Sequence, residues 1–389
     1  MHTDFSRHNE EVRRVTEAFH AGRPLRPLFQ PAGSITNFFQ NRALNTERLT
    51  FEGFFTDPTV QIRAQLAYQN WRRHNLFCDM EMGMPEKWTL GLDFQNSYEA
   101  SWIGAEIVYN GEYLPDTRYM LREHKEALYD MPKIVPAVNG VIKTGMEFLE
   151  FMEDWCKEHT FCDRPVEPPR SFVGEGTDGV LNLAYKLRGA EELLVDMLED
   201  EAYYRDLMEW LTNNIIHRIG TLRDMHEKHW GVRPKGFYYA DDAMCLISHP
   251  MYREYVLPYQ RRIIDAFRDG GKVGMHLCGS NMHHFGGLVK ELPINALDTG
   301  FPVDFDRLRE LVGRDVLISG GPPVMLVKDG TREDVRRETK RVLESKSARQ
   351  GRFILIAANN MAPCTPPENI VAMYDTLRTM HWEEGYYEK

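Results

Sequence analysis

The chain has 389 residues, of which 42% are apolar and 27% are charged, values that are ordinary for a globular protein. Its 47 basic and 58 acidic residues give a net charge of -11, which argues against a sequence-independent nucleic-acid binder because phosphate binding needs a basic surface. No segment approaches the roughly 20 consecutive apolar residues of a membrane helix, and the polar N-terminal residues lack the apolar run of a signal peptide. We therefore expect a cytoplasmic enzyme that acts on small molecules, with neither nucleic acid nor membrane as a partner.

Eight short apolar runs recur along the chain, each ending in glycine, proline or a polar residue. Short runs without polar and apolar alternation are typical of strands that are buried on both faces. The sequence therefore predicts strands at residues 28–31, 76–81, 171–176, 236–241, 273–278, 296–300, 316–320 and 353–358.

Amphipathic patterns predict helices between the later runs, at 251–268, 331–343 and 366–380, with two helices in 190–230. Strand followed by helix, repeated to eight strands, is the pattern of a (β/α)8 TIM barrel, an α/β fold. We expect one such domain over residues 1–389. A doubly wound open sheet is the structural alternative, although no G-x-G-x-x-G follows the first strand. Two segments stand outside the repeat: an N-terminal helical extension at 1–24 and an insertion after the second strand at 82–145.

Polar residues follow the predicted strands, at the end where a barrel places its active site. Carboxylates, an imidazole and a thiol at one mouth indicate a metal site or an acid–base site. These residues are Asp79, Glu81, Glu175, Asp178, Asp241, Asp242, His276, Cys278, Asn359 and Asn360.

The sharpest local feature is the sequence His276-Leu277-Cys278. Residues two apart in a strand point to the same face, so this imidazole and thiol could form half of a tetrahedral zinc site. The alternative is two core residues in a strand. Cys364 follows the eighth strand and could supply a third ligand, which leaves the fourth position for substrate. Its alternative is a loop cysteine with no role.

Asp241 and Asp242 end the fourth run, and either could be a general base or a metal ligand. The alternative is an N-terminal helix cap, which is disfavoured because the next apparent helix begins later, near His249.

Six ordered segments carry a resemblance to a known family. They are residues 239–242, 257–264, 276–279, 318–322, 329–335 and 365–370. The chain resembles the uroporphyrinogen decarboxylase superfamily and, within it, the cobalamin-dependent methyltransferase branch. The resemblance covers most of the chain and is strongest from about Gly236 onward.

This resemblance implies a (β/α)8 barrel and a catalytic zinc. In the methyltransferase members an H-x-C pair and a later cysteine bind the metal, and the pair carries over to His276 and Cys278. The later cysteine usually lies several residues before a T-P-x-x-N-I segment, where this chain has Asn359 and Asn360. Cys364 stands immediately before that segment. The third ligand is therefore either a displaced Cys364 or another group such as a carboxylate.

An arginine-rich R-Q-A-G-R segment marks true uroporphyrinogen decarboxylases near the N-terminus. The corresponding residues 25–33 of this chain read LRPLFQPAG. The absence of the motif argues against porphyrinogen decarboxylation.

The resemblance implies methyl transfer between a small substrate and the cobalamin of a separate corrinoid protein, because the chain shows no D-x-H-x-x-G corrinoid signature. The substrate would be a methoxylated aromatic, another methyl donor or a thiol. Zinc would act as the Lewis acid, and Asp241, Asp242 or Glu81 would handle the proton. We expect substrate contacts from Asp79, Glu175, Tyr239, Asn359 and Asn360.

Two other functions remain open. A metal-free decarboxylase or lyase on the same barrel predicts no bound zinc and tolerance of Cys278→Ser. A non-catalytic corrinoid-handling barrel predicts an incomplete site, and the absence of a cysteine near Asn359 favours it.

Overall fold

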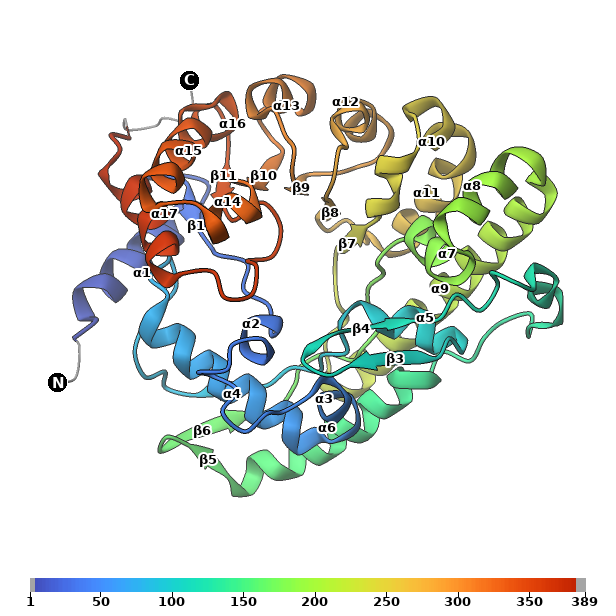
Figure 1. The fold of residues 1–389 in the computed structure, drawn as a ribbon, viewed down its shortest axis with the longest axis horizontal. Coiled ribbons are helices and arrows are strands. Elements are labelled where there is room, and N and C mark those ends of the chain that lie inside the picture. Colours follow the sequence, from blue (N-terminus) through green and yellow to red (C-terminus); the bar gives the residue numbers. More distant parts are fainter. Residues whose placement is uncertain (1–3, 383–389) are drawn as a thin grey trace. The chain divides into compact units, whose positions relative to one another are not determined.

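The computed structural model describes residues 4–382 (Figure 1). The chain folds into two compact units. The first unit comprises Met1–Arg48, Arg63–Glu86 and Leu277–Lys389, and the second comprises Leu49–Ile62 and Lys87–His276. One boundary between them falls inside a strand, directly after His276.

The first unit is built mainly from alternating short strands and helices. Within the described residues its elements are α1 (Ser6–His20), β1 (Leu28–Phe29), α2 (Thr36–Phe39), most of α4 (Pro58–Asn75), α12 (Met282–Glu291), β9 (Ala296–Thr299), α13 (Phe305–Val312), β10 (Leu317–Gly320), α14 (Val324–Asp329), α15 (Arg332–Glu344), α16 (Lys346–Arg349), β11 (Phe353–Leu355) and α17 (Pro367–Thr379).

The second unit is richer in helix and carries two small extra sheets. Its elements are α3 (Phe51–Thr56), β2 (Trp88–Thr89), η1 (Gln95–Ser97), α5 (Tyr98–Ile103), β3 (Ile107–Asn110), β4 (Tyr113–Thr117), η2 (Lys125–Asp130), α6 (Gly140–Glu158), β5 (Thr160–Phe161), β6 (Arg164–Glu167), α7 (Val180–Arg188), α8 (Ala190–Glu199), α9 (Glu201–Trp230), β7 (Phe237–Ala240), η3 (Asp242–Leu246), α10 (His249–Tyr255), α11 (Leu257–Phe267) and β8 (Val273–Leu277).

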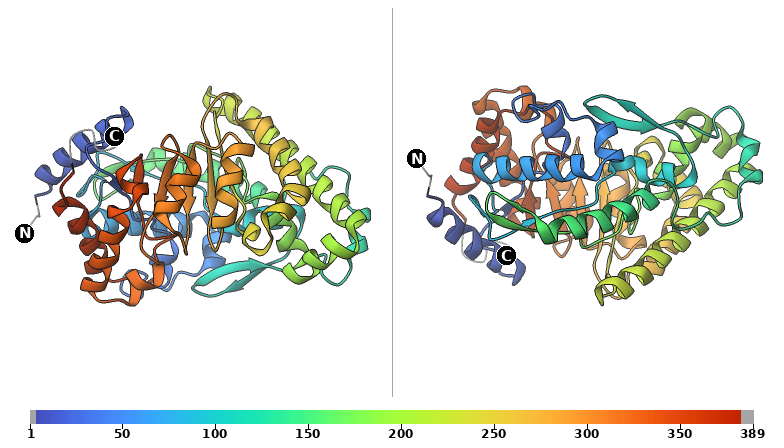
Figure 2. Two further views of the ribbon diagram at one scale, coloured as in Figure 1. Left: turned by 90° about the horizontal axis from the view of Figure 1, so that it is seen from above. Right: turned by 90° about the horizontal axis from the view of Figure 1, so that it is seen from below.

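Six parallel strands form one sheet in the order β1-β11-β10-β9-β8-β7. The first strand of the chain pairs with the last, as in a barrel, and helices connect β8 to β9, β9 to β10 and β10 to β11. In the first unit, β9 and β10 lie side by side in both views of Figure 2, where both strands are orange. The predicted α/β fold of parallel strands and intervening helices is therefore confirmed.

The predicted run 76–81 does not form a strand. Asp79 N donates to the Phe29 carbonyl at 2.9 Å, but Phe29 N donates to the Asp79 carboxylate at 2.7 Å. A side chain thus replaces the backbone acceptor that would continue a ladder, and the run departs from β1.

The predicted run 171–176 is also not a strand. Gly174 has a φ of 89°, which lies outside the strand region. The Arg218 guanidinium takes the carbonyl oxygens of Gly174 and Gly176, so these oxygens serve a side chain rather than a neighbouring strand. One parallel bridge remains, between Thr177 and Tyr239 of β7.

The predicted helices are present with adjusted limits. Segment 190–230 forms α8 and α9, as expected, and 331–343 forms α15, which begins with a capping box between Thr331 and Asp334. Segment 251–268 divides into α10 and α11 around Val256, just before Pro258, because proline lacks the amide that a continuing helix needs.

The two segments outside the repeat have their own structure. Helix α1 lies within 1–24, and 82–145 contains β2, η1, α5, the hairpin β3–β4, η2 and the start of α6. The single domain, the extension and the insertion stay predictions. Within residues 4–382, no helix combines the length and the hydropathy needed to cross a bilayer.

Candidate metal centre

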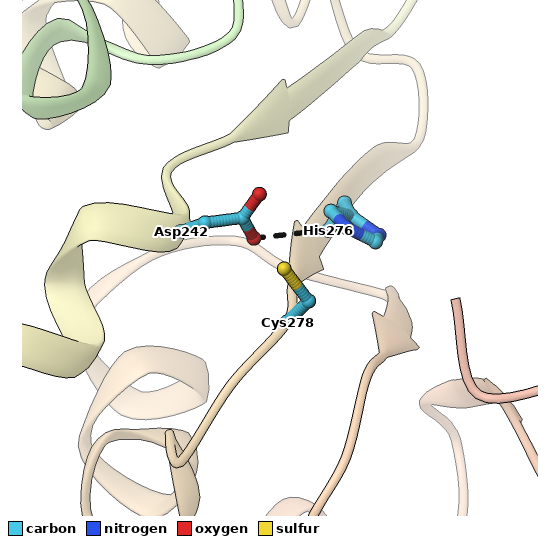
Figure 3. A group of neighbouring side chains, drawn as sticks. All are labelled: Asp242, His276 and Cys278. Atoms are coloured by element: carbon cyan, nitrogen blue, oxygen red, sulfur yellow. Dashed lines mark ion pairs between the residues drawn. The ribbon is translucent and has the colours of Figure 1, made fainter. Parts of the chain in front are cut away.

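Three side chains with metal-binding atoms gather where β7 and β8 end. They are Asp242, His276 and Cys278, and their ligand atoms all lie within 4.8 Å of one another. His276 Nε2 is 3.6 Å from Asp242 Oδ1. Figure 3 shows the Asp242 carboxylate directed at His276, with the Cys278 sulfur beside it. Each of the three side chains is half-buried, so the group is accessible from solvent.

Strand pairing explains this proximity. The parallel register places Ala240 of β7 opposite His276 of β8, and Asp242 follows Ala240 by two residues. Cys278 follows His276 by two residues in the same extended segment, so the strand itself holds the sulfur near the imidazole. Local strand geometry therefore brings His276 and Cys278 together, and the pairing of β7 with β8 adds Asp242.

The donor set suits zinc. An imidazole nitrogen, a thiol sulfur and a carboxylate oxygen are the three ligand types that zinc binds in proteins. Zinc–ligand bonds of about 2.0–2.3 Å put the ligands of one ion roughly 3–4 Å apart. The spacing in this group is compatible with such a site after small side-chain rotations, and a fourth position would remain for a substrate.

Asp241, the neighbour of this group, has a different environment. Its side chain is fully buried and accepts hydrogen bonds from Asn182 N at 2.7 Å and Gln260 Nε2 at 2.8 Å, with longer bonds from Leu181 N and Tyr239 Oη. Burial raises the pKa of Asp241 to about 7. The carboxyl binds the first amides of α7, so it is an N-terminal cap for a helix far earlier in the sequence.

Tyr239 is also fully buried. Its hydroxyl accepts from Val180 N at 2.9 Å and donates to Asp241 at 3.1 Å, and burial raises its pKa. The hydroxyl therefore helps to fix the start of α7, and this geometry gives no support to the expected contact with substrate.

Asn182 was missed by the sequence analysis, yet it connects the two loops around the centre. Its Nδ2 donates to the Asp178 carbonyl at 2.7 Å, and its Oδ1 accepts from Ala243 N at 2.7 Å. The side chain thereby holds the turn that carries Asp242. No sequence signal could reveal this role, because an asparagine inside a helical pattern is ordinary.

Asp79 belongs to the first unit and lies in its core. The carboxylate forms a bidentate ion pair with Arg26, with both hydrogen bonds at 2.7 Å. It also accepts hydrogen bonds from Phe29 N and Tyr374 Oη. Its side chain has no exposed surface. The carboxylate is therefore a buried structural partner of Arg26, and its expected contact with substrate stays a prediction.

Glu81 and Glu175 make ion pairs as well. Glu81 is exposed and pairs with Arg13 at 2.7 Å. Glu175 accepts from Phe172 N and lies 2.8 Å from His226 Nδ1. Neither residue is a member of the three-residue group, and their catalytic or substrate-binding roles stay predictions.

The residues beyond β11 lie in the first unit. Asn359 has a φ of 101° and its side chain accepts from the amide of the exposed Asn360. The exposed Cys364 donates to the Gln40 carbonyl at 3.4 Å. Across the described part of the chain, the metal-binding group has Asp242 rather than Cys364 as its third member. A ligand role for Cys364 stays a prediction.

Comparisons with known proteins agree with this architecture. Residues 176–380 match the model of the uroporphyrinogen decarboxylase family. A solved methyltransferase from Methanosarcina mazei superposes with a TM-score of 0.62 at 14% identity, over 94% of this chain and 98% of that one. At this identity the similarity concerns the fold.

The curated relatives match a shorter segment. The methylcobamide:CoM methyltransferase MtbA of Methanosarcina acetivorans is 29% identical over 135 residues, which are 34% of this chain and 38% of the relative. A uroporphyrinogen decarboxylase of Syntrophotalea carbinolica is 29% identical over 143 residues, 35% of this chain and 38% of the relative. The matched segment thus spans less than two fifths of either relative.

Proposed function

Because this chain belongs to the uroporphyrinogen decarboxylase family, we propose that it is a zinc-dependent methyltransferase of that family. It moves a methyl group between a small substrate and the cobalamin of a separate corrinoid protein. The single observation that carries this proposal is the group of Asp242, His276 and Cys278, whose three ligand types suit catalytic zinc. The methyltransferase names of two relatives support the reaction class.

Three side chains of this chain would hold the zinc: His276 through Nε2, Cys278 as thiolate and Asp242 through one carboxylate oxygen. When bound, zinc supplies a Lewis acid for the heteroatom that carries or receives the methyl group. The substrate enters at the half-buried mouth of the group. A methoxylated aromatic, another methyl donor or a thiol would fit this chemistry.

The surrounding residues hold the ligands in position. Asp241 fixes the N-terminus of α7, and Asn182 on α7 fixes the turn after Asp242. Groups of this kind matter because metal ligands lose affinity when the shell around them is loosened. We therefore assign Asp241 to positioning, and Asp242 to metal binding.

The test is the zinc content of purified protein, measured by plasma mass spectrometry. We expect about one zinc per chain in wild type, and strong loss in Cys278→Ser and Asp242→Asn. Asp265→Asn is the matched control, since this carboxylate is half exposed and pairs with the neighbouring Arg268. Cys364→Ser decides the remaining ligand: retained zinc leaves Asp242 as the third ligand, and lost zinc assigns that place to Cys364.

Wild-type protein that neither holds zinc nor takes it up would refute the proposal. A metal-free decarboxylase or lyase, or a corrinoid-handling barrel without activity, would then be the better hypothesis. Direct assay of methyl transfer uses free cob(I)alamin with methoxylated aromatics, and free methylcobalamin with a thiol.

A further inference from the structure

We propose that Asp178 is a further catalytic residue of this centre, the carboxylic acid that protonates the substrate oxygen from which the methyl group departs. The inference rests on the proposed function and deepens it, because it selects the direction of transfer from substrate to corrinoid. All residues that carry it belong to the second unit.

An isolated bridge places the backbone before Asp178 next to β7. Thr177 forms a parallel bridge with Tyr239 of β7, and β7 pairs with β8. Asp178 directly follows the bridge, just as Asp242 follows β7. Bridged backbones lie about 4.8 Å apart, so Asp178 follows the bridge at the same end of β7 that Asp242 follows.

The Asn182 side chain joins the two loops directly. It binds the carbonyl of Asp178 on one side and the amide of Ala243 on the other, both at 2.7 Å. The backbones that carry Asp178 and Asp242 are therefore separated by a single amide group. This contact fixes the Asp178 loop relative to the centre.

The backbone of Asp178 is held from the opposite side by a buried ion pair. Glu99 of α5 accepts from Asp178 N at 2.7 Å and pairs with Arg218 of α9 at 2.6 Å. Arg218 in turn binds the carbonyls of Gly174 and Gly176. The printed hydrogen bonds of this ion pair go to the loop backbone, and Arg218 Nη1 is buried without a partner among the described residues.

The Asp178 carboxyl is therefore in an unusual position. Its Oδ2 is buried and has no hydrogen-bond partner among the described residues, while the residue as a whole is only partly buried. A buried carboxylate oxygen without a donor disfavours the anion, which favours the neutral acid. A neutral carboxyl at the edge of a metal centre can donate a proton.

Charges on four elements act on this carboxyl. Burial is the largest cause that raises the pKa of Asp178, to about 7, and the negative charges of Glu99 on α5 and Asp242 on η3 act in the same direction. Lys186 on α7 and Arg218 on α9 oppose them. Burial and Glu99 would continue to favour the neutral acid when Asp242 binds zinc, whereas the contribution of Asp242 would be cancelled.

The proton balances the proposed step. A methyl ether R–O–CH3 reacts with cob(I)alamin: the O–CH3 bond breaks, its carbon forms a bond to cobalt, and cobalt(I) becomes methylcobalt(III). The electron pair of the broken bond stays on oxygen, which takes the proton of Asp178 to give R–OH. Asp178 is left as the carboxylate and regains a proton from solvent. Transfer to a thiol would instead release a proton, for which a neutral carboxyl is of no use.

The first test needs no turnover. Infrared difference spectra at pH 7 compare wild type with Asp178→Asn, both loaded with zinc, in the carbonyl region of protonated carboxylic acids. We expect a band in wild type that is missing in the variant. Asp163→Asn is the control, because Asp163 is an exposed loop residue of the same unit. No band lost in Asp178→Asn would overturn the proposal.

The second test is a leaving-group series. Para-substituted anisoles, from 4-methylanisole to 4-nitroanisole, are demethylated with free cob(I)alamin. Asp178→Asn should slow the demethylation of 4-methylanisole by about 10²–10⁴-fold. It should slow the demethylation of 4-nitroanisole by less than about tenfold, since nitrophenolate departs without a proton. Asp178→Glu should restore the wild-type pattern.

The outcomes separate the two proposals. If Asp178→Asn slows the demethylation of all anisoles equally, Asp178 has a structural role. That result would overturn the proposal that Asp178 is the proton donor. If Asp178→Asn demethylates the anisoles at the wild-type rate, the proton-donor proposal is also overturned. The proposed methyltransferase function would not be affected by that result. Wild type that binds no zinc and demethylates none of the anisoles would overturn both proposals.

Discussion

Nε2 of His276 on β8 lies 3.6 Å from Oδ1 of Asp242, which begins η3 just after β7. A cation between them would replace a weak polar contact by two metal bonds. Cys278 adds a thiol that must lose its proton to bind. The ligand group is thus a carboxylate, an imidazole and a thiol whose binding of zinc is linked to pH.

We expect the zinc affinity of wild type to rise with pH, because both the imidazole and the thiol bind zinc only in the unprotonated form. Competition with a chromogenic chelator between pH 6 and 8 measures the slope. Cys278→Ser should bind more weakly and with a smaller slope. An affinity that is independent of pH would contradict a ligand set that contains this thiol.

Asp79→Asn should destabilise the first unit by about 3–5 kcal/mol, because it leaves the buried Arg26 without its charged partner. Urea unfolding monitored by tryptophan fluorescence measures the change. The control is Glu81→Gln, whose exposed pair with Arg13 should contribute less than about 1 kcal/mol. Zinc content should stay at the wild-type value in both variants. A stable Asp79→Asn with impaired turnover would instead favour contact with substrate.

Gly179→Ala should unfold the second unit or strongly destabilise it. An added Cβ would lie 2.0 Å from the Ala240 carbonyl oxygen and 2.5 Å from Cγ of Asp241. Gly104→Ala is the matched control, since this glycine also has a positive φ but no atom within 4 Å of the added carbon. The control should show only the backbone strain of about 1–2 kcal/mol. Circular dichroism on heating measures the thermal stability of the two variants. Equal losses of stability would show that the structure around Gly179 relieves the clash.

Glu99→Leu should destabilise by about 3–5 kcal/mol, because Arg218 would be buried without a counter-charge. The double variant Glu99→Leu with Arg218→Met should be less destabilised than the single one, since it removes both charges. Chemical denaturation of the three proteins gives the comparison. If the double variant loses more unfolding free energy than the single one, Arg218 stabilises the loop carbonyls independently of Glu99.

Local patterns were sufficient to predict much of the fold. Six of the eight apolar runs form strands of one parallel sheet, and the capping box at Thr331 gives the start of α15. The runs at 76–81 and 171–176 fail because the Asp79 carboxylate and the Arg218 guanidinium take backbone groups that a ladder would need. Such side-chain contacts join residues far apart in sequence, and no local pattern contains them.

The sequence by itself determined that an imidazole and a thiol lie near each other, because a spacing of two residues in a strand puts both on one face. Only the tertiary structure decided that Asp242 joins them, since this follows from the register of β7 against β8. It likewise decided that Asp79, Asp241 and Tyr239 are buried and have distant hydrogen-bond partners. Their environments depend on Arg26, Gln260 and the N-terminus of α7, and the polarity of a residue says nothing about which distant donor will meet it on folding.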